Sequence, residues 1–173
     1  MATIRPFKAI RPADDLADKI AALPYDVMNT EEAREMVKDN PYSFLHIDRA
    51  EIDLPEGIDP YAPEVYEKAR DTLNNMIADG QFVQDAKPCF YLYRLVMNGR
   101  AQTGLAVTAS VEEYEKGIIK KHELTRADKE QDRINHVNIT NAHTGPIFLA
   151  YRDEDEIRQL IDGVKQTVPI YDF

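Results

Sequence analysis

"PCFYLYRLVMNGRAQTGLAVTASV", residues 88–111, places two runs of β-forming residues on either side of Asn98–Gly99. Asparagine and glycine tolerate the positive φ angles that a two-residue hairpin turn requires. After the turn, apolar residues alternate with smaller or more polar ones, which predicts one packed strand face. We therefore expect residues 89–97 and 102–111 to pair as an antiparallel hairpin at the centre of the main sheet. The apolar residues of the second run are Leu105, Val107, Ala109 and Val111.

Three more segments are predicted to be strands from their apolar and aromatic composition. The first is "IRPFKAIRP", residues 4–12, which Pro12 closes. The second is "YSFLHID", residues 42–48, and the third is "PIFLAY", residues 146–151.

Four segments carry helix signals. One helix starts with Asn29 or Thr30 as its cap and ends at Pro41. A second runs from Pro63 to Gly80 and carries one apolar stripe. Two more are expected, one from Thr125 toward Ala142 that stops before Gly145–Pro146, and one within residues 153–164. The stripe of the second helix consists of Val65, Ala69, Leu73 and Met76.

This order of helices and strands predicts an α+β, or mixed α/β, fold in which helices flank a sheet with a central hairpin. The length of 173 residues fits one domain over residues 1–173. The apolar runs are too short to cross a bilayer, and no signal-peptide pattern follows Met1, so a cytoplasmic protein is expected. Cys89 is the single cysteine, and we expect it to be a small buried residue of a strand, neither part of a disulfide nor a nucleophile.

The charge balance argues against nucleic acid as a partner. Lysine and arginine number 21 and aspartate and glutamate 31, which gives a formal net charge of −10. Binding to phosphate backbones needs clustered basic residues instead. The sequence also contains no glycine-rich phosphate loop and no serine-hydrolase elbow. No metal site is expected, because His122, Glu123, His136 and His143 lack an H-E-x-x-H spacing and a cysteine pair.

Residues 120–133, "KKHELTRADKEQDR", gather charged side chains around a predicted helix start. His122 and Glu123 come just before that start, where backbone N–H groups favour an anion. A histidine can exchange protons near neutral pH, and the glutamate can orient it or act as a base. The alternative is a capped, solvated helix start without a ligand. On the helix, Ile134, Val137 and Asn141 share one face, and Asp132, His136 and Thr140 share another.

Four blocks of the sequence resemble a known bacterial and archaeal family. They are "LPYDVM" (23–28), "NPYSFLHID" (40–48), "KKHELTRADKEQDR" (120–133) and "NAHTGPIFLAY" (141–151), and they stand in the family's order. The chain resembles the domain-of-unknown-function family 1015, whose members often lie near serine-biosynthesis genes. That family is similar in part to the ParB/sulfiredoxin-like superfamily, which includes free-serine kinases. The resemblance makes residues 1–173 the N-terminal portion of a longer family protein.

The resemblance implies a small-molecule phosphotransferase, with serine as the favoured substrate and Mg²⁺ with ADP or ATP as cofactors. It implies catalytic roles for Asp26, His122 and Glu123, with Asp26 close to His122. Full-length members also carry a D-G-H-H-R block that binds phosphate, and this sequence lacks it, so the chain alone is expected to be inactive. The residues implied in binding substrate or phosphate are Tyr25, Lys121, Thr125, Arg126, Asp132, Arg133 and Asn141.

Two alternatives stay open beside the phosphotransferase. The first is a ligand-binding or regulatory module that senses an anionic metabolite without catalysis. The second is a ParB-like DNA-associated protein, which the acidic net charge disfavours.

Overall fold

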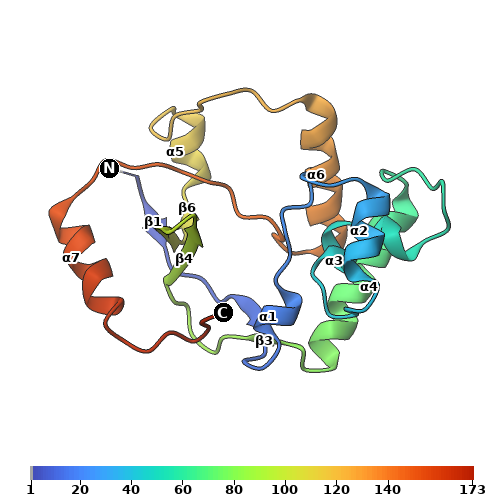
Figure 1. Cartoon of the computed structure of the whole chain (residues 1–173). Helices are drawn as coiled ribbons and strands as arrows, with labels where there is room; N and C mark the ends of the chain where they lie inside the picture. Colours follow the sequence, from blue (N-terminus) through green and yellow to red (C-terminus); the bar gives the residue numbers. More distant parts are fainter. Residues whose placement is uncertain (1) are drawn as a thin grey trace. The chain divides into compact units, whose positions relative to one another are not determined.

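The computed structural model describes residues 2–173 and divides the chain into two compact units. Unit 1 comprises the chain up to Ile10 together with Gln84–Leu124 and Pro146–Asp172. Unit 2 comprises Arg11–Val83 and Thr125–Gly145, with Phe173. The fold is α+β, as predicted: two short strands are followed by a block of helices, then by four strands and three more helices (Figure 1). That residues 1–173 form one domain stays a prediction.

Unit 1 contains most of the strands and two helices. Its elements are β1 (Ile4–Arg5), β4 (Tyr91–Met97), β5 (Arg100–Ala106), β6 (Thr108–Ala109), α5 (Val111–Glu115) and α7 (Asp155–Val164). Unit 2 contains the other helices: α1 (Ala17–Ile20), α2 (Thr30–Val37), α3 (Leu45–Asp48), the 3-10 helix η1 (Ala50–Asp53), α4 (Pro63–Ala78) and α6 (Ala127–Thr140). Strands β2 (Ile10–Pro12) and β3 (Phe82–Gln84) pair with each other, and the sequence boundary between the units falls within both of them.

The predicted hairpin is confirmed. β4 and β5 are antiparallel, and Met97 pairs with Arg100 across the turn. Asn98 and Gly99 have φ angles of 51° and 76°, which are the positive values expected for this turn. The expected place at the centre of a larger sheet is wrong, because the strands within residues 2–173 pair only two by two: β1 with β6, β2 with β3 and β4 with β5.

Two predicted strands do not form. Residues 42–48 contain helix α3 instead. Leu45 and Ile47 are buried in two different clusters, and their spacing of two residues resembles the alternation of a strand, which is why a strand was predicted. The Ser43 hydroxyl accepts a hydrogen bond from the Leu45 N–H at the start of this helix. Residues 146–151 form no strand, because no strand among residues 2–173 pairs with them.

The N-terminal strand prediction is partly right, and the prediction for Cys89 is wrong. Residues 4–12 hold β1 and β2 with a break between them. Phe7 pairs with Cys89 in an isolated antiparallel bridge inside this break. Cys89 therefore takes part in β pairing, but its side chain is exposed, because a single bridge brings no second layer to cover it.

The four predicted helices are confirmed. Asn29 caps α2 in a capping box with Glu32, and α4 begins at Pro63. All four residues of the predicted α4 stripe are buried. Helix α7 forms as expected but buries none of its side chains.

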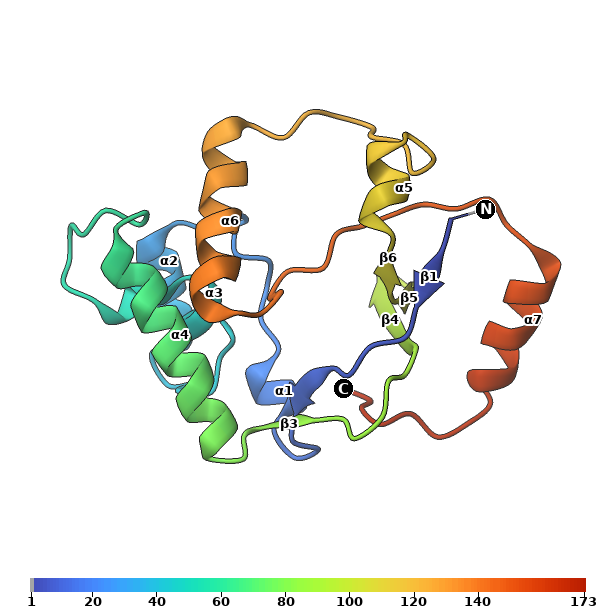
Figure 2. The same ribbon diagram turned by 180° about the vertical axis from the view of Figure 1, so that it is seen from behind.

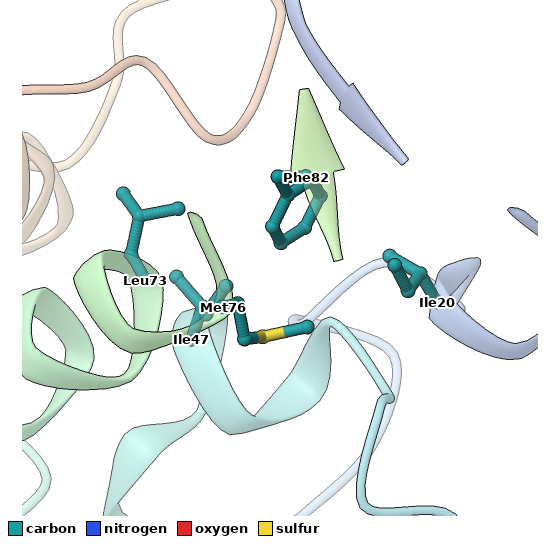
Figure 3. Packing of buried hydrophobic residues seen from close by; sticks show 5 residues of the cluster. All are labelled: Ile20, Ile47, Leu73, Met76 and Phe82. Carbon is teal, nitrogen blue, oxygen red and sulfur yellow. The ribbon is translucent and has the colours of Figure 1, made fainter. Parts of the chain in front are cut away.

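The hydrophobic core lies in unit 2. Figure 3 shows its largest described cluster, in which Ile47 packs among residues from α1, α4 and β3. The other members of that cluster are Ile20, Leu73, Met76 and Phe82. Every buried side chain among residues 2–173 belongs to unit 2, so unit 1 has no buried core of its own in the part of the chain that is described. No helix of this described part is both long and apolar enough to span a membrane.

His46 makes the stability of unit 2 depend on pH. Its Nδ1 lies 2.9 Å from Asp53 Oδ2, and its Nε2 lies 3.2 Å from the Asn40 carbonyl oxygen. The hydrogen bond to Asp53 raises the pKa of His46 above 6.5, although burial opposes the shift. A raised folded-state pKa means that the stabilisation is complete below pH 6.5 and is lost as pH rises through the folded-state pKa.

We therefore expect the urea midpoint of unfolding to fall as pH rises from about 6.5, the unperturbed pKa of histidine. His46→Gln should flatten this part of the profile. His143→Gln, at an exposed position of unit 2, is the matched control and should keep it. Equal pH profiles for wild type and His46→Gln would contradict the assignment.

Candidate functional site

Helix α6 turns its polar residues inward. Its buried side chains are Asp132, His136 and Thr140, whereas Ile134 is exposed. The helix lies against α4, as both views of the ribbon show (Figures 1 and 2). A helix that buries its polar face needs partners for each polar group, because an unpaired buried polar atom costs about 1–3 kcal/mol.

The Asp132 carboxylate is the centre of this buried network. Its Oδ1 accepts a hydrogen bond of 2.9 Å from the Tyr66 hydroxyl on α4. Its Oδ2 accepts two from Arg133, from Nε at 3.1 Å and from Nη2 at 3.0 Å. Burial and the bond to Asp132 raise the pKa of Tyr66 to about 12. Tyr66 therefore stays a protonated donor at neutral pH, and both carboxylate oxygens are engaged.

His136 and Thr140 continue the network along α6. Nε2 of His136 lies 3.2 Å from the Ile47 carbonyl oxygen, and its ring meets the Tyr66 ring edge-on at 6.4 Å. The Thr140 hydroxyl donates to the His136 carbonyl oxygen at 2.6 Å. These contacts tie α6 to α3 and α4, so His136 is a packed structural histidine.

Arg133 is held on two sides. Its guanidinium lies 4.3 Å from the centre of the Tyr25 ring, and its edge is fixed by Asp132. About a third of the Arg133 side chain stays exposed, and its Nη1 has no hydrogen-bond partner among residues 2–173. We call the group of Tyr25, Tyr66, Asp132 and Arg133 the Tyr25–Arg133 site.

Arg49 fixes the loop that carries Tyr25. Its Nη1 donates to the carbonyl oxygens of Tyr25 and Met28, each at 3.2 Å, and its Nη2 donates to the Thr30 hydroxyl at 2.9 Å. The buried Glu51 carboxylate pairs with Arg49 Nε at 2.8 Å. The Thr30 hydroxyl also donates to the Glu51 carboxylate at 3.2 Å. Together these five polar contacts hold Tyr25 and its neighbours before any ligand binds.

Lys129 stands one helical turn before Arg133. Its ammonium donates to the Tyr61 hydroxyl at 2.7 Å and lies 5.3 Å from the centre of that ring. The hydrogen bond with Tyr61, with help from the Asp132 and Asp128 charges, raises the pKa of Lys129. Lys129 and Arg133 therefore each contact a tyrosine, and the two tyrosines come from different loops.

The start of α6 differs from the prediction. The helix was expected to start at Thr125, but Arg126 is the N-cap residue and makes no side-chain cap. Asp128 instead accepts two hydrogen bonds from Arg126, at 2.7 and 3.1 Å, and Thr125 is exposed. Asn141 ends the helix with a left-handed φ of 54°, which asparagine tolerates.

The implied site residues divide between the units. Tyr25, Asp132 and Arg133 come together in unit 2, and Asp26 directly follows Tyr25 with an exposed side chain. His122 and Glu123 lie in unit 1, where both are exposed and 3.4 Å separates His122 Nε2 from Glu123 Oε1. The proximity of Asp26 to His122 joins residues of different units and stays a prediction. Lys121, also in unit 1, lies over the Tyr114 ring at 4.8 Å.

The sequence analysis missed Tyr61, Tyr66 and Lys129. The spacing of Lys129 and Arg133 could have indicated a site, because like charges four residues apart on a helix repel each other and suggest that each has a compensating partner. Tyr66 carried none, since nothing in its spacing points to Asp132.

The donor set of this site fits an anion. Mg²⁺ prefers free carboxylate and carbonyl oxygens, and both Asp132 oxygens are already engaged. Within residues 2–173, no group of three or more histidine, cysteine or acidic side chains is placed to hold a metal. The site therefore offers cations and hydroxyl groups to a ligand, and no step through Mg²⁺ follows from it.

A family model described as "Protein of unknown function (DUF1015)" matches residues 4–173. The matched range includes all four residues of the Tyr25–Arg133 site. No curated protein and no solved structure matches the chain.

Proposed function

Because this chain belongs to the DUF1015 family of proteins of unknown function, its own residues must indicate what it does, and we propose that it binds an anionic small molecule at the Tyr25–Arg133 site. The observation that carries the proposal is the fixed guanidinium of Arg133, held between the Tyr25 ring and the Asp132 carboxylate with Nη1 unpaired. An arginine in a fixed orientation loses little entropy when it meets a carboxylate or phosphate.

Packing alone accounts less well for this arrangement. A purely structural ion pair between neighbouring residues would not need the stacked tyrosine, nor a loop fastened by Arg49 and Glu51. Neutralising the buried Asp132 carboxylate explains the ion pair with Arg133, but it does not explain the Tyr25 ring stacked on the guanidinium. Orienting a cation for a ligand gives a direct reason.

The binding proposal is tested with inorganic phosphate as the probe, by titration calorimetry at low ionic strength. Arg133→Met should weaken phosphate binding about 10- to 100-fold, because a hydrogen bond to a charged group contributes about 1.5–3 kcal/mol. Arg70→Met is the matched control: Arg70 lies on α4 of the same unit and, among residues 2–173, pairs only with its neighbour Asp71. An Arg133→Met protein that binds phosphate as tightly as Arg70→Met would overturn the proposal.

Phosphoryl transfer to a small-molecule hydroxyl is the second candidate, and Asp26 favours it. This exposed carboxylate directly follows Tyr25, so a hydroxyl near the arginine-bound anion could lose its proton to it. The ParB/sulfiredoxin-like and free-serine-kinase relationships, serine as the substrate, ADP or ATP with Mg²⁺, and catalysis by His122 and Glu123 are parts of this second proposal. They rest on the sequence blocks alone.

The test of the second candidate is phosphoserine formation from serine with ATP, ADP or pyrophosphate. We expect no measurable turnover from the 173-residue chain, because its sequence contains no D-G-H-H-R block. Turnover that Asp26→Asn abolishes would make the chain a kinase in its own right. Phosphate binding without turnover would leave the binding proposal in place.

A further inference from the structure

The pair of Lys129 and Tyr61 has no role in the proposed function, yet it repeats the design of the Tyr25–Arg133 site. In both places a cation of α6 contacts a tyrosine: the Arg133 guanidinium lies over the Tyr25 ring at 4.3 Å, and the Lys129 ammonium donates to the Tyr61 hydroxyl at 2.7 Å. Tyr61 comes from the loop before α4 and Tyr25 from the loop before α2. Two separate loops therefore each supply one ring to the same helix.

The positive charge of Lys129 is not neutralised by a partner of its own. Of the two carboxylates whose charges raise the pKa of Lys129, Asp128 is bound by Arg126, and Asp132 is bound by Arg133 and Tyr66. Lys129 forms no ion pair among residues 2–173, and its one hydrogen bond goes to the neutral Tyr61 hydroxyl. The two carboxylates that act on Lys129 are therefore both engaged with other donors.

The two cations lie on the same side of α6. Residues four apart on a helix have Cβ atoms about 5–6 Å from each other, and like charges there cost a few tenths of a kcal/mol. Free lysine and arginine side chains would swing apart. The tyrosine contacts hold each of them in place instead.

Both positions keep donors for a ligand. The Lys129 ammonium has three N–H groups, of which Tyr61 takes one, and the Tyr61 hydroxyl still has its own hydrogen to donate. Arg133 keeps its Nη1 hydrogens, since its Nε and Nη2 donate to Asp132. Each position can therefore hold a separate anionic group.

Resting on the proposed function, we infer that Lys129 and Tyr61 form a second anion subsite beside Arg133, and that the ligand is a small molecule with two anionic groups. One group binds the Arg133 Nη1 edge, and the other binds the Lys129 ammonium and the Tyr61 hydroxyl. A ligand with a single anionic group fills only one of these positions.

The experiment compares inorganic phosphate with pyrophosphate by titration calorimetry at fixed ionic strength. Wild type should bind pyrophosphate at least tenfold more tightly than phosphate. Lys129→Met should reduce this ratio to about twofold, Tyr61→Phe should lower it partly, and Lys129→Arg should retain it. Lys38→Met, which removes an exposed lysine at the C-cap of α2 in the same unit, controls for the change in net charge and should leave the ratio unchanged.

The outcomes separate the two proposals. If phosphate binding is insensitive to Arg133→Met, the proposed function fails and this inference fails with it. If phosphate binding depends on Arg133 but Lys129→Met behaves like Lys38→Met, only the second subsite is wrong. A double-mutant cycle tests the same point. The effects of Lys129→Met and Arg133→Met on the free energy of binding should be coupled for pyrophosphate and additive for phosphate.

Discussion

Replacing Ile47 by alanine is expected to lower the free energy of unfolding by about 2–5 kcal/mol, the range for isoleucine-to-alanine changes in cores. The Ile47 side chain is fully buried and touches residues from α1, α4 and β3 (Figure 3). These elements pack around this one side chain, so they cannot easily close the cavity that alanine leaves. The cavity adds to the lost burial, and urea unfolding followed by far-ultraviolet circular dichroism measures the sum.

Ile77→Ala provides the matched control. Ile77 lies on α4 next to the buried Met76, but more than a third of its side chain is exposed. Alanine is also the better helix former, so we expect a loss below about 1 kcal/mol. Equal losses at both positions would mean that the cluster around Ile47 is not the core of unit 2.

Asp132→Ala should cost about 1–3 kcal/mol, because it leaves the buried Tyr66 hydroxyl without an acceptor. Tyr66→Phe should also destabilise, since Asp132 then loses its one donor from α4. The double variant should lose less than the sum of the two single losses, because removing both partners of a buried bond leaves no unpaired group. Urea unfolding of the three variants measures this coupling.

Asp128→Ala is the control for a change of charge on α6. The Asp128–Arg126 pair is exposed, and such pairs contribute about 0–1 kcal/mol. If Asp132→Ala were as mild as Asp128→Ala, or if the double variant were additive, the buried network would not be what joins α6 to α4.

Local sequence signals predicted the local parts of the fold. Asn98–Gly99 determined a turn, Asn29 with Glu32 determined a helix start, and Pro63 began α4, because in each case the stabilising contacts lie within a few residues. The strand predicted at residues 42–48 failed for the opposite reason. Leu45 and Ile47 follow the period of a strand, but they serve two clusters, and the other members of the Ile47 cluster are distant in the sequence.

The candidate site was only partly predictable. The family resemblance pointed to Tyr25, Asp132 and Arg133, which the structure brings together. Neither resemblance nor spacing indicated Tyr61 or Tyr66, since their partners on α6 are determined by helix packing between distant segments. The inward-facing polar side of α6 was equally hidden, because an apolar residue such as Ile134 is ordinarily expected to face the core.

The bond between Tyr66 and Asp132 joins residues 66 positions apart, and this separation determines when unit 2 can be completed during synthesis. At about 5–20 residues per second, a ribosome adds 66 residues in roughly 3–13 s. During that time α4 has left the ribosome but has no α6 to pack against, and the Tyr66 hydroxyl can bond only to water. Residues 84–124 of unit 1 are made in this interval, so the hairpin can close before unit 2 is complete.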